Sequence, residues 1–151
     1  MESNVNVKDR EMSISRLLNA PVDLVWEVFA NPEHIMQWWG PDGFTNTLEI
    51  MDLKPGGEWN FTMHGPNGMD FANHSVFREI VPLEKIHFEH YNPHIMFTIT
   101  FEAQGDKTLL NWHMLFDSAE IFEAVAKAHG AVEGLKQNIV KLEAYLGAMK
   151  G

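Results

Sequence analysis

The chain has 151 residues, no cysteine and a formal net charge of −10, from 21 acidic and 11 basic residues. This length suits one domain, which we expect over 11–151, after a flexible polar arm at 1–10. The acidic balance argues against nucleic acid and membrane surfaces as partners, and the lack of cysteine excludes disulfides, thiolate nucleophiles and cysteine-bound metals. The sequence contains no apolar run of signal-peptide or membrane-span length, so we expect a cytoplasmic location.

A strand and two short helices are predicted first. Apolar and polar residues alternate between Glu11 and Asn19, which is typical of a half-buried strand. From Pro21 onward the apolar residues recur every three or four positions until Asn31-Pro32, as they do in a helix. A second short helix is predicted over 32–38.

The stretch Trp38-Trp39-Gly40-Pro41 follows the second helix. A helix does not continue through it, because glycine is conformationally permissive and proline favours a turn. The tryptophans either fill the core or line a ligand cavity. We expect Trp39, rather than Trp38, to point inward and to close one end of a hollow.

Six strand-like runs come next, separated by short turns rich in glycine and proline. Connections this short join antiparallel neighbours. With the first strand, they predict an antiparallel sheet of about seven strands. The six runs are 44–53, 58–64, 70–81, 85–91, 95–103 and 108–116.

The apolar period becomes helical again after Phe116, with Asp117 or Ser118 as the helix cap. Glycines interrupt this long segment, and we expect a break or kink near His129-Gly130. The order of elements predicts an α+β fold, in which a curved antiparallel sheet wraps its apolar face around the long C-terminal helix.

Six motifs along the chain resemble the bacterial and archaeal family called activator of heat-shock-protein-90 ATPase homologue-like. This family belongs to the START-type, Bet v 1-like (SRPBCC) superfamily. The likeness covers about residues 11–147, in the same order and spacing. The motifs are Asn19-Ala20-Pro21 with Val25-Trp26, Asn31-Pro32-Glu33-His34, Trp38-Trp39-Gly40-Pro41, Leu53-Lys54-Pro55-Gly56-Gly57, Phe77-Arg78-Glu79-Ile80-Val81-Pro82 and Ala131-Val132-Glu133-Gly134.

The resemblance implies the helix-grip fold of that superfamily. It also implies that a hydrophobic ligand binds between the sheet and the long helix, and some members of the superfamily catalyse reactions there. The family takes its name from a eukaryotic co-chaperone domain. Because one fold hosts many functions, the resemblance carries no catalytic residues over to this chain.

The hollow between the sheet and the long helix is the main candidate site. The ten Phe, nine Met and five Trp residues of the chain suit either a tightly packed core or a pliable pocket. Small residues at Ala124, Ala126, Ala128, Gly130, Ala131 and Gly134 would widen the hollow or merely bend the helix. The candidate lining residues are Trp39, Phe61, Met63, Phe71, Asn73, Phe77, Phe88, His90, Phe97, Phe101, Trp112, Met114, Phe122, Val125 and Leu135.

Asn73 and His90 are polar residues at positions that otherwise carry apolar side chains. A buried polar group needs a hydrogen-bond partner, which a neighbouring side chain, a trapped water or a ligand supplies. His90 has the chemistry of a general acid or base, but no neighbour in sequence orients it. Ser75 and His90 lack the sequence signature of a nucleophile and its base.

The eight histidines of the chain raise the question of a metal site. His87 and His90 are separated by an odd number of positions on a predicted strand, so they face opposite sides of the sheet. His90 with His94 is a weak pair beyond a turn. We therefore expect neither a metal nor another cofactor.

The leading hypothesis is a binding protein for a small apolar or aromatic ligand, without a defined reaction. An enzyme of the cyclase or hydrolase type in the same cavity is one alternative, with His90, Asn73 or a tyrosine in the reaction. A co-chaperone-like regulator of heat-shock protein 90 is another. The sequence leaves open whether the protein is a monomer or a homodimer.

Overall fold

The computed structural model describes residues 4–91 and 93–150. Within these residues, eight strands form one antiparallel sheet, with the strand order β1-β2-β8-β7-β6-β5-β4-β3. The elements are β1 (Asn4–Lys8), β2 (Glu11–Leu18), α1 (Val22–Ala30), α2 (Pro32–Trp38), β3 (Thr45–Met51), β4 (Glu58–His64), β5 (Asp70–Val81), β6 (Lys85–Tyr91), β7 (Ile95–Gln104), β8 (Lys107–Phe116), α3 (Ala119–His129) and α4 (Ala131–Lys150).

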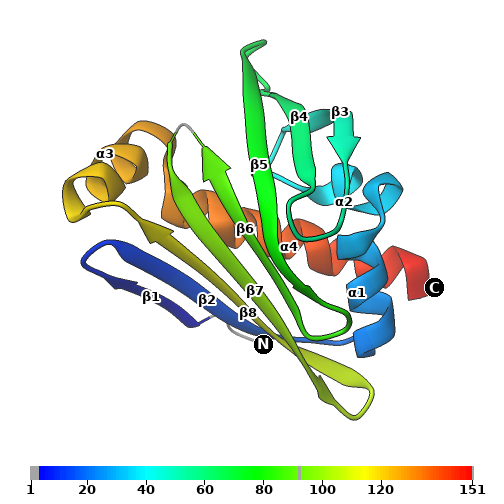
Figure 1. Cartoon of the computed structure of the whole chain (residues 1–151). Helices are drawn as coiled ribbons and strands as arrows, with labels where there is room; N and C mark the ends of the chain where they lie inside the picture. The colour runs from blue at the N-terminus through cyan, green and yellow to red at the C-terminus, as the bar shows by residue number, and fades with distance from the viewer. Residues whose placement is uncertain (1–3, 92, 151) are drawn as a thin grey trace.

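The sheet curves around the C-terminal helix (Figure 1). Figure 1 shows α4 running across one face of the sheet, from α3 at one end to α1 and α2 at the other. Helix α4 contacts α1, α2, α3 and β2. This arrangement confirms the predicted α+β helix-grip fold.

The core lies between the concave face of the sheet and the helices. Leu135, Ile139, Leu142 and Leu146 recur every three or four residues along α4, and all four are buried. Alternate residues of the strands face them, because side chains along a strand point to opposite faces. The apolar stripe of the helix and the apolar face of the sheet therefore bury each other.

Most predicted element boundaries agree with the structure within two residues. Strands β4, β5 and β6 and helix α2 span the predicted ranges 58–64, 70–81, 85–91 and 32–38. These segments combine clear periodicity with glycine or proline at their ends, which are the strongest local signals of an element boundary.

The predicted break in the long helix is confirmed at Gly130. This residue ends α3 in the left-handed conformation, with φ 57° and ψ 46°, and its N–H donates to Ala126 O. Glycine adopts this conformation without the steric cost that other residues meet. At the start of α3 the cap is Ser118, whose Oγ accepts from the N–H of Ile121 at 3.1 Å.

The flexible arm predicted at 1–10 is wrong for Asn4–Lys8. Asn4–Lys8 forms β1, which pairs with β2 from Asn4↔Ser15 to Lys8↔Glu11, so the sheet has one strand more than expected. Asp9 adopts a positive φ of 58° in the turn between the two strands. Residues 4–8 are ordered as a strand because they pair with β2 at the edge of the sheet. The rest of the predicted arm at 1–3 lies outside the described residues.

Candidate functional site

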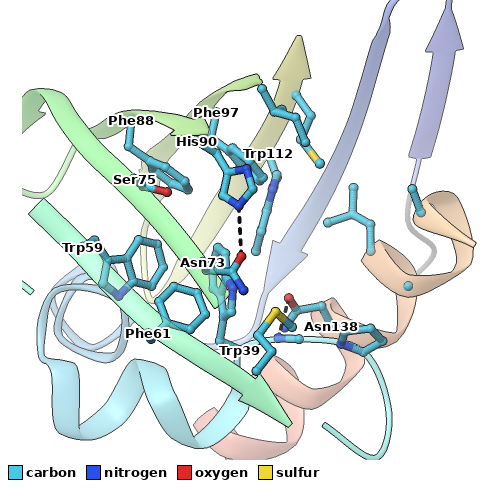
Figure 2. A pocket seen from close by; sticks show the side chains of 18 residues that line it. Trp39, Trp59, Phe61, Asn73, Ser75, Phe88, His90, Phe97, Trp112 and Asn138 are labelled. Atoms are coloured by element: carbon cyan, nitrogen blue, oxygen red, sulfur yellow. Dashed lines mark hydrogen bonds between the residues drawn. The ribbon is translucent and has the colours of Figure 1, made fainter. Parts of the chain in front are cut away.

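A pocket of about 230 Å³ lies between the sheet and the N-terminal half of α4 (Figure 2). Strands β4 to β8 supply its sheet side, and the turn after α2 supplies one end. Of the residues predicted from sequence, those that line it are Trp39, Phe61, Met63, Asn73, Phe88, His90, Phe97, Trp112, Met114 and Leu135.

The sheet side of the pocket is a set of residues in register across the strands. Trp59 on β4 pairs with Ser75 on β5, and Ser75 pairs with His90 on β6. Paired residues of neighbouring antiparallel strands point to the same face of a sheet, so this row faces the pocket together. Asn73 stands beside it, paired with Phe61.

Aromatic rings make most of the pocket wall. Trp39 stacks on Trp112 with ring centroids 5.0 Å apart, and it meets Trp59 edge-on at 4.9 Å. Phe88 and Phe97 stack at 4.5 Å on the neighbouring strands β6 and β7. These contacts hold the rings in fixed positions, so the cavity has a defined shape.

Trp38 and Trp39 are both buried, with 1% and 7% of their surface exposed. The expectation that only Trp39 points inward is therefore wrong, although Trp39 is the one that lines the pocket. Trp38 belongs to the core, where its indole N–H donates to Val28 O at 3.0 Å and its ring packs against Phe29.

Asn138 of α4 fixes the turn that carries Trp39. Its Nδ2 donates to Trp38 O at 2.9 Å, and its Oδ1 accepts from the N–H of Gly40 at 3.0 Å. From the other side, Asn46 Nδ2 donates to Trp39 O at 2.9 Å. Asn138 is buried and lines the pocket, and sequence reasoning missed it. The sequence signal that could have identified Asn138 is a single polar residue between Leu135 and Ile139, within the apolar face that α4 buries.

Two of the four α4 residues that line the pocket have small side chains or none. Ala131 and Gly134 line the pocket beside Leu135. Both belong to the run of small residues noted in the sequence; the side chain of Ala128, from the same run, lies outside the described residues. A Cβ atom on Gly134 would meet Pro41 at 3.5 Å, an ordinary contact distance, so this position would accept a Cβ without a clash.

His90 and Asn73 lie within hydrogen-bond distance of each other in the pocket wall. Figure 2 shows the two side chains facing one another, with His90 Nε2 2.9 Å from Asn73 Oδ1. The other ring nitrogen, Nδ1, lies 2.8 Å from Pro93 O, and Asn73 Nδ2 donates to Phe71 O at 3.1 Å. The sequence left open what these polar groups would contact, and the structure places the two side chains against each other.

Burial lowers the pKa of the His90 imidazole below its usual value. The hydrogen bond to Pro93 O opposes this shift, whereas the nearby His74 and His94 add to it. Because the largest effect is loss of solvation of the charged ring, burial in the pocket wall favours the neutral form of His90.

Three other polar atoms around the pocket have no hydrogen-bond partner among the described residues. They are Ser75 Oγ and the indole nitrogens of Trp59 and Trp112, all buried. Ser75 Oγ makes no hydrogen bond to His90, although the two residues are paired across the strands. The arrangement is therefore not that of a nucleophile bound to its base.

Five predicted lining residues lie elsewhere. Phe77 stacks on Trp59 at 5.9 Å behind the pocket wall, and Phe101 packs against Trp26 and Phe29 near α1. The others are also outside the lining: Phe71 packs against Phe44, Phe122 against Phe116, and Val125 against the core. The sequence correctly placed the three strand residues among these five on the inner face of the sheet. The pocket, however, occupies only part of that face. The lining also includes Ala131 and Gly134 from the predicted run of small residues, and six residues that were not predicted: Gly40, Pro41, Trp59, Ser75, Ile95 and Asn138.

The outer face of the sheet carries a separate network of charged groups. His94 lies between two carboxylates, 2.6 Å from Glu89 Oε2 and 2.6 Å from Asp117 Oδ1. Glu89 also pairs with Arg78 at 2.8 Å. The hydrogen bonds from His94 and Arg78 lower the pKa of Glu89 to about 2, and the Asp117 and Glu89 carboxylates raise the pKa of His94.

His87 and His90 face opposite sides of β6, as predicted. His87 Nδ1 lies 2.8 Å from Phe97 O and 2.9 Å from Thr98 Oγ1, away from the pocket. Within the described part of the chain, no group of three or more His, Cys, Asp or Glu side chains is placed to hold a metal ion. No helix in that part is long and apolar enough to cross a membrane.

Several solved structures share this fold. A protein from Arthrobacter aurescens is 23% identical over 96% of this chain and 91% of its own length, with a TM-score of 0.90. A Mycobacterium smegmatis protein is 24% identical over 99% of this chain and 98% of its own, with a TM-score of 0.86. An AHSA1-like protein from Aeromonas hydrophila is 17% identical over 92% of this chain and 94% of its own, with a TM-score of 0.71. No curated protein matches the chain.

The family described as activator of Hsp90 ATPase homolog 1-like protein matches residues 19–147. This range runs from the end of β2, through the whole pocket wall, to the last turns of α4. The resemblance read from the motifs is thus confirmed: the chain belongs to the family of activator of Hsp90 ATPase homolog 1-like proteins.

Proposed function

We propose that the protein binds a small apolar or aromatic ligand in the pocket between the sheet and α4. The observation that carries this proposal is the wall itself, in which Trp39, Trp59 and Trp112 with other aromatic residues surround about 230 Å³. Ligand sites are typically concave and apolar, with a few polar groups that orient the ligand. His90 and Asn73 supply such groups here.

The size of the pocket limits the ligand. An engineered apolar cavity of about 150 Å³ binds benzene, whereas sites for drug-sized molecules measure about 300–1,000 Å³. A volume of about 230 Å³ lies between these cases. It suits a molecule of about two fused rings or a short branched chain.

Native mass spectrometry of the protein after incubation with a cell extract tests this proposal. A retained mass that an added competitor displaces supports it, and the absence of any retained or competable mass under gentle conditions contradicts it. The competitor is naphthalene, which matches the expected size.

A pair of glycine substitutions on α4 sharpens the test. Gly134→Leu places a side chain in the pocket, whereas Gly147→Leu makes the same change where no heavy atom lies within 4 Å. Both replace a helical glycine, so neither loses helix propensity. The proposal predicts that only Gly134→Leu abolishes ligand retention; equal retention by both variants contradicts it.

An enzyme in the same pocket is the second candidate, because His90 lies in the wall within hydrogen-bond distance of Asn73. Turnover of any substrate found there should then disappear in His90→Ala, in a variant that circular dichroism shows to be folded. The co-chaperone alternative predicts that the protein changes the ATPase rate of heat-shock protein 90, and an unchanged rate removes it. The expected cytoplasmic location is tested by cell fractionation.

A further inference from the structure

A chain of contacts runs through the pocket wall between two backbone carbonyl groups. It starts at Phe71 O, passes through the Asn73 amide and the His90 ring, and ends at Pro93 O. Carbonyl oxygens only accept hydrogen bonds, so the protons in this chain come from the amide and the ring. The following inference rests on the proposed ligand-binding function and concerns the class of ligand.

The positions of the protons determine the charge of the ring. Asn73 Nδ2 donates to Phe71 O, and this turns Oδ1, an acceptor, toward His90 Nε2. The other ring nitrogen faces Pro93 O, also an acceptor. Both contacts are hydrogen bonds only if both ring nitrogens carry a proton, which makes the ring a cation. A neutral ring leaves one pair of acceptors facing each other without a proton.

The residues that line the pocket offer no negative charge to balance that cation. Of the described residues that line it, His90 is the only titratable one. The titratable groups that act on it from the neighbouring elements are His74 of β5 and His94 of the turn before β7, and both disfavour a second positive charge. The contact geometry therefore favours a protonated ring, whereas the surroundings oppose it. An anion inside the pocket removes this conflict.

We propose that the ligand is a compact apolar weak acid, whose carboxylate approaches the protonated His90 ring at Nε2 and shares the Nε2–H with Asn73 Oδ1 in a bifurcated hydrogen bond. The apolar body of the acid lies against the aromatic wall formed by Trp39, Trp112 and their neighbours. Binding of the carboxylate takes up one proton from the solvent, which goes to the imidazole. All contacts between Phe71 O and Pro93 O are then hydrogen bonds.

Two probes of matched size separate this proposal from simple apolar binding. Naphthalene-2-carboxylate carries the charge, and 2-acetylnaphthalene has the same ring system with a neutral carbonyl group. Isothermal titration calorimetry in phosphate and in Tris measures proton uptake, because the two buffers differ in ionisation enthalpy. The proposal predicts uptake of about one proton with the carboxylate, and an affinity that falls by up to about tenfold per pH unit above neutral pH. The neutral probe should bind without either effect.

Two histidine variants test whether His90 is the residue that takes up the proton when the carboxylate binds. His90→Gln keeps a hydrogen-bonding side chain but does not titrate, so it should abolish proton uptake and weaken the carboxylate by about tenfold, the usual scale for loss of a charge-assisted hydrogen bond. Its affinity for 2-acetylnaphthalene should fall less than its affinity for the carboxylate, because the neutral carbonyl group has no charge to lose a partner for. His87→Gln, on the same strand but the opposite face, is the control and should leave both probes unchanged.

The possible results separate the two proposals. Binding of the neutral probe with weaker or proton-independent binding of the carboxylate overturns the weak-acid ligand and leaves the ligand-binding function standing. Binding of neither probe, with the same result in Gly134→Leu, overturns both. Tight carboxylate binding with proton uptake that persists in His90→Gln also overturns the assignment to His90.

Discussion

His90 and His94 are close together in the chain, but one lines the pocket and the other lies between Glu89 and Asp117 outside it. Burial lowers the pKa of His90, and two carboxylates raise the pKa of His94. The same residue type is therefore driven toward the neutral form on the inner face and toward the charged form on the outer face.

This contrast extends to the two faces of the sheet. The inner face combines aromatic rings with a few neutral polar groups, such as Asn73 and Asn138, each of which contacts two buried or half-buried polar partners. The outer face carries ion pairs, such as Arg78 with Glu89, that solvent partly screens. Buried hydrogen bonds are costly to leave unmade, whereas exposed ion pairs contribute little, so substitutions on the two faces should differ in size.

The largest effect is expected for Asn138→Ala. This change leaves Trp38 O and the N–H of Gly40 without their partner in the core, at a cost of roughly 2–4 kcal/mol in unfolding free energy. Chemical denaturation measures the change. The neighbouring Gln137→Ala is the control, because Gln137 binds the exposed N–H of Asp42 in the same loop, and it should change stability by less than about 0.5 kcal/mol. Equal effects of the two variants would contradict the role of Asn138 in holding the tryptophan turn.

Two serine substitutions should have opposite signs. Ser75 Oγ is buried without a partner among the described residues, so Ser75→Ala should leave the protein as stable or more stable by up to about 1 kcal/mol. Ser118 caps α3, so Ser118→Ala should cost about 1 kcal/mol. Thermal unfolding of both variants checks this difference. A clear loss of stability in Ser75→Ala would mean that its hydroxyl has a structural role.

The fold was more predictable from sequence than the site. Strands such as β4 and β6 have local signals, namely alternating apolar residues between glycine or proline turns, and their limits match. Alternation also gives the face of each residue, but it does not give its position along the strand relative to α4. Phe77 and Phe101 were therefore predicted at the pocket although they lie in the core beyond it, and Trp59 was missed.

Two further features depend on contacts that the local sequence does not reveal. The turn at Asp9 brings Asn4–Lys8 onto β2, and the pairing itself stabilises a strand with few apolar residues. The role of Asn138 requires the Trp38-to-Gly40 turn to lie against α4, and these segments are far apart in the chain. In both cases tertiary contacts, rather than local periodicity, determine the outcome.

The pH dependence of stability should distinguish the two histidines. The pKa of His90 is lowered on folding, so its contribution is present above the usual histidine pKa of about 6.5 and is lost as the pH falls. The pKa of His94 is raised, so its contribution is present below about 6.5 and is lost as the pH rises through the raised value. The stability difference between wild type and His90→Gln should thus shrink toward acid, and that for His94→Gln should shrink toward alkali. Parallel profiles of the two variants would contradict the assigned environments.

The smallest effect is expected for Glu89→Gln. Its ion pairs with Arg78 and His94 are partly exposed, so the loss should be about 1 kcal/mol or less and should decrease with added salt. Because folding lowers the pKa of Glu89 to about 2, this contribution is present above the usual value of about 4.3 and disappears as the pH falls toward about 2. Urea titrations across this range test the prediction, and a loss as large as that of Asn138→Ala would contradict the contrast between the faces.

The central claim, that the pocket binds a small apolar ligand, is tested most directly by the indole N–H signals in a two-dimensional NMR spectrum. Trp39, Trp59 and Trp112 line the pocket, whereas Trp26 and Trp38 do not. Titration with 2-acetylnaphthalene should shift the signals of the first three residues in a saturable way, leave the other two nearly unchanged, and have no effect in Gly134→Leu. Shifts that fail to saturate, or that are equal for all five tryptophans, would contradict the claim.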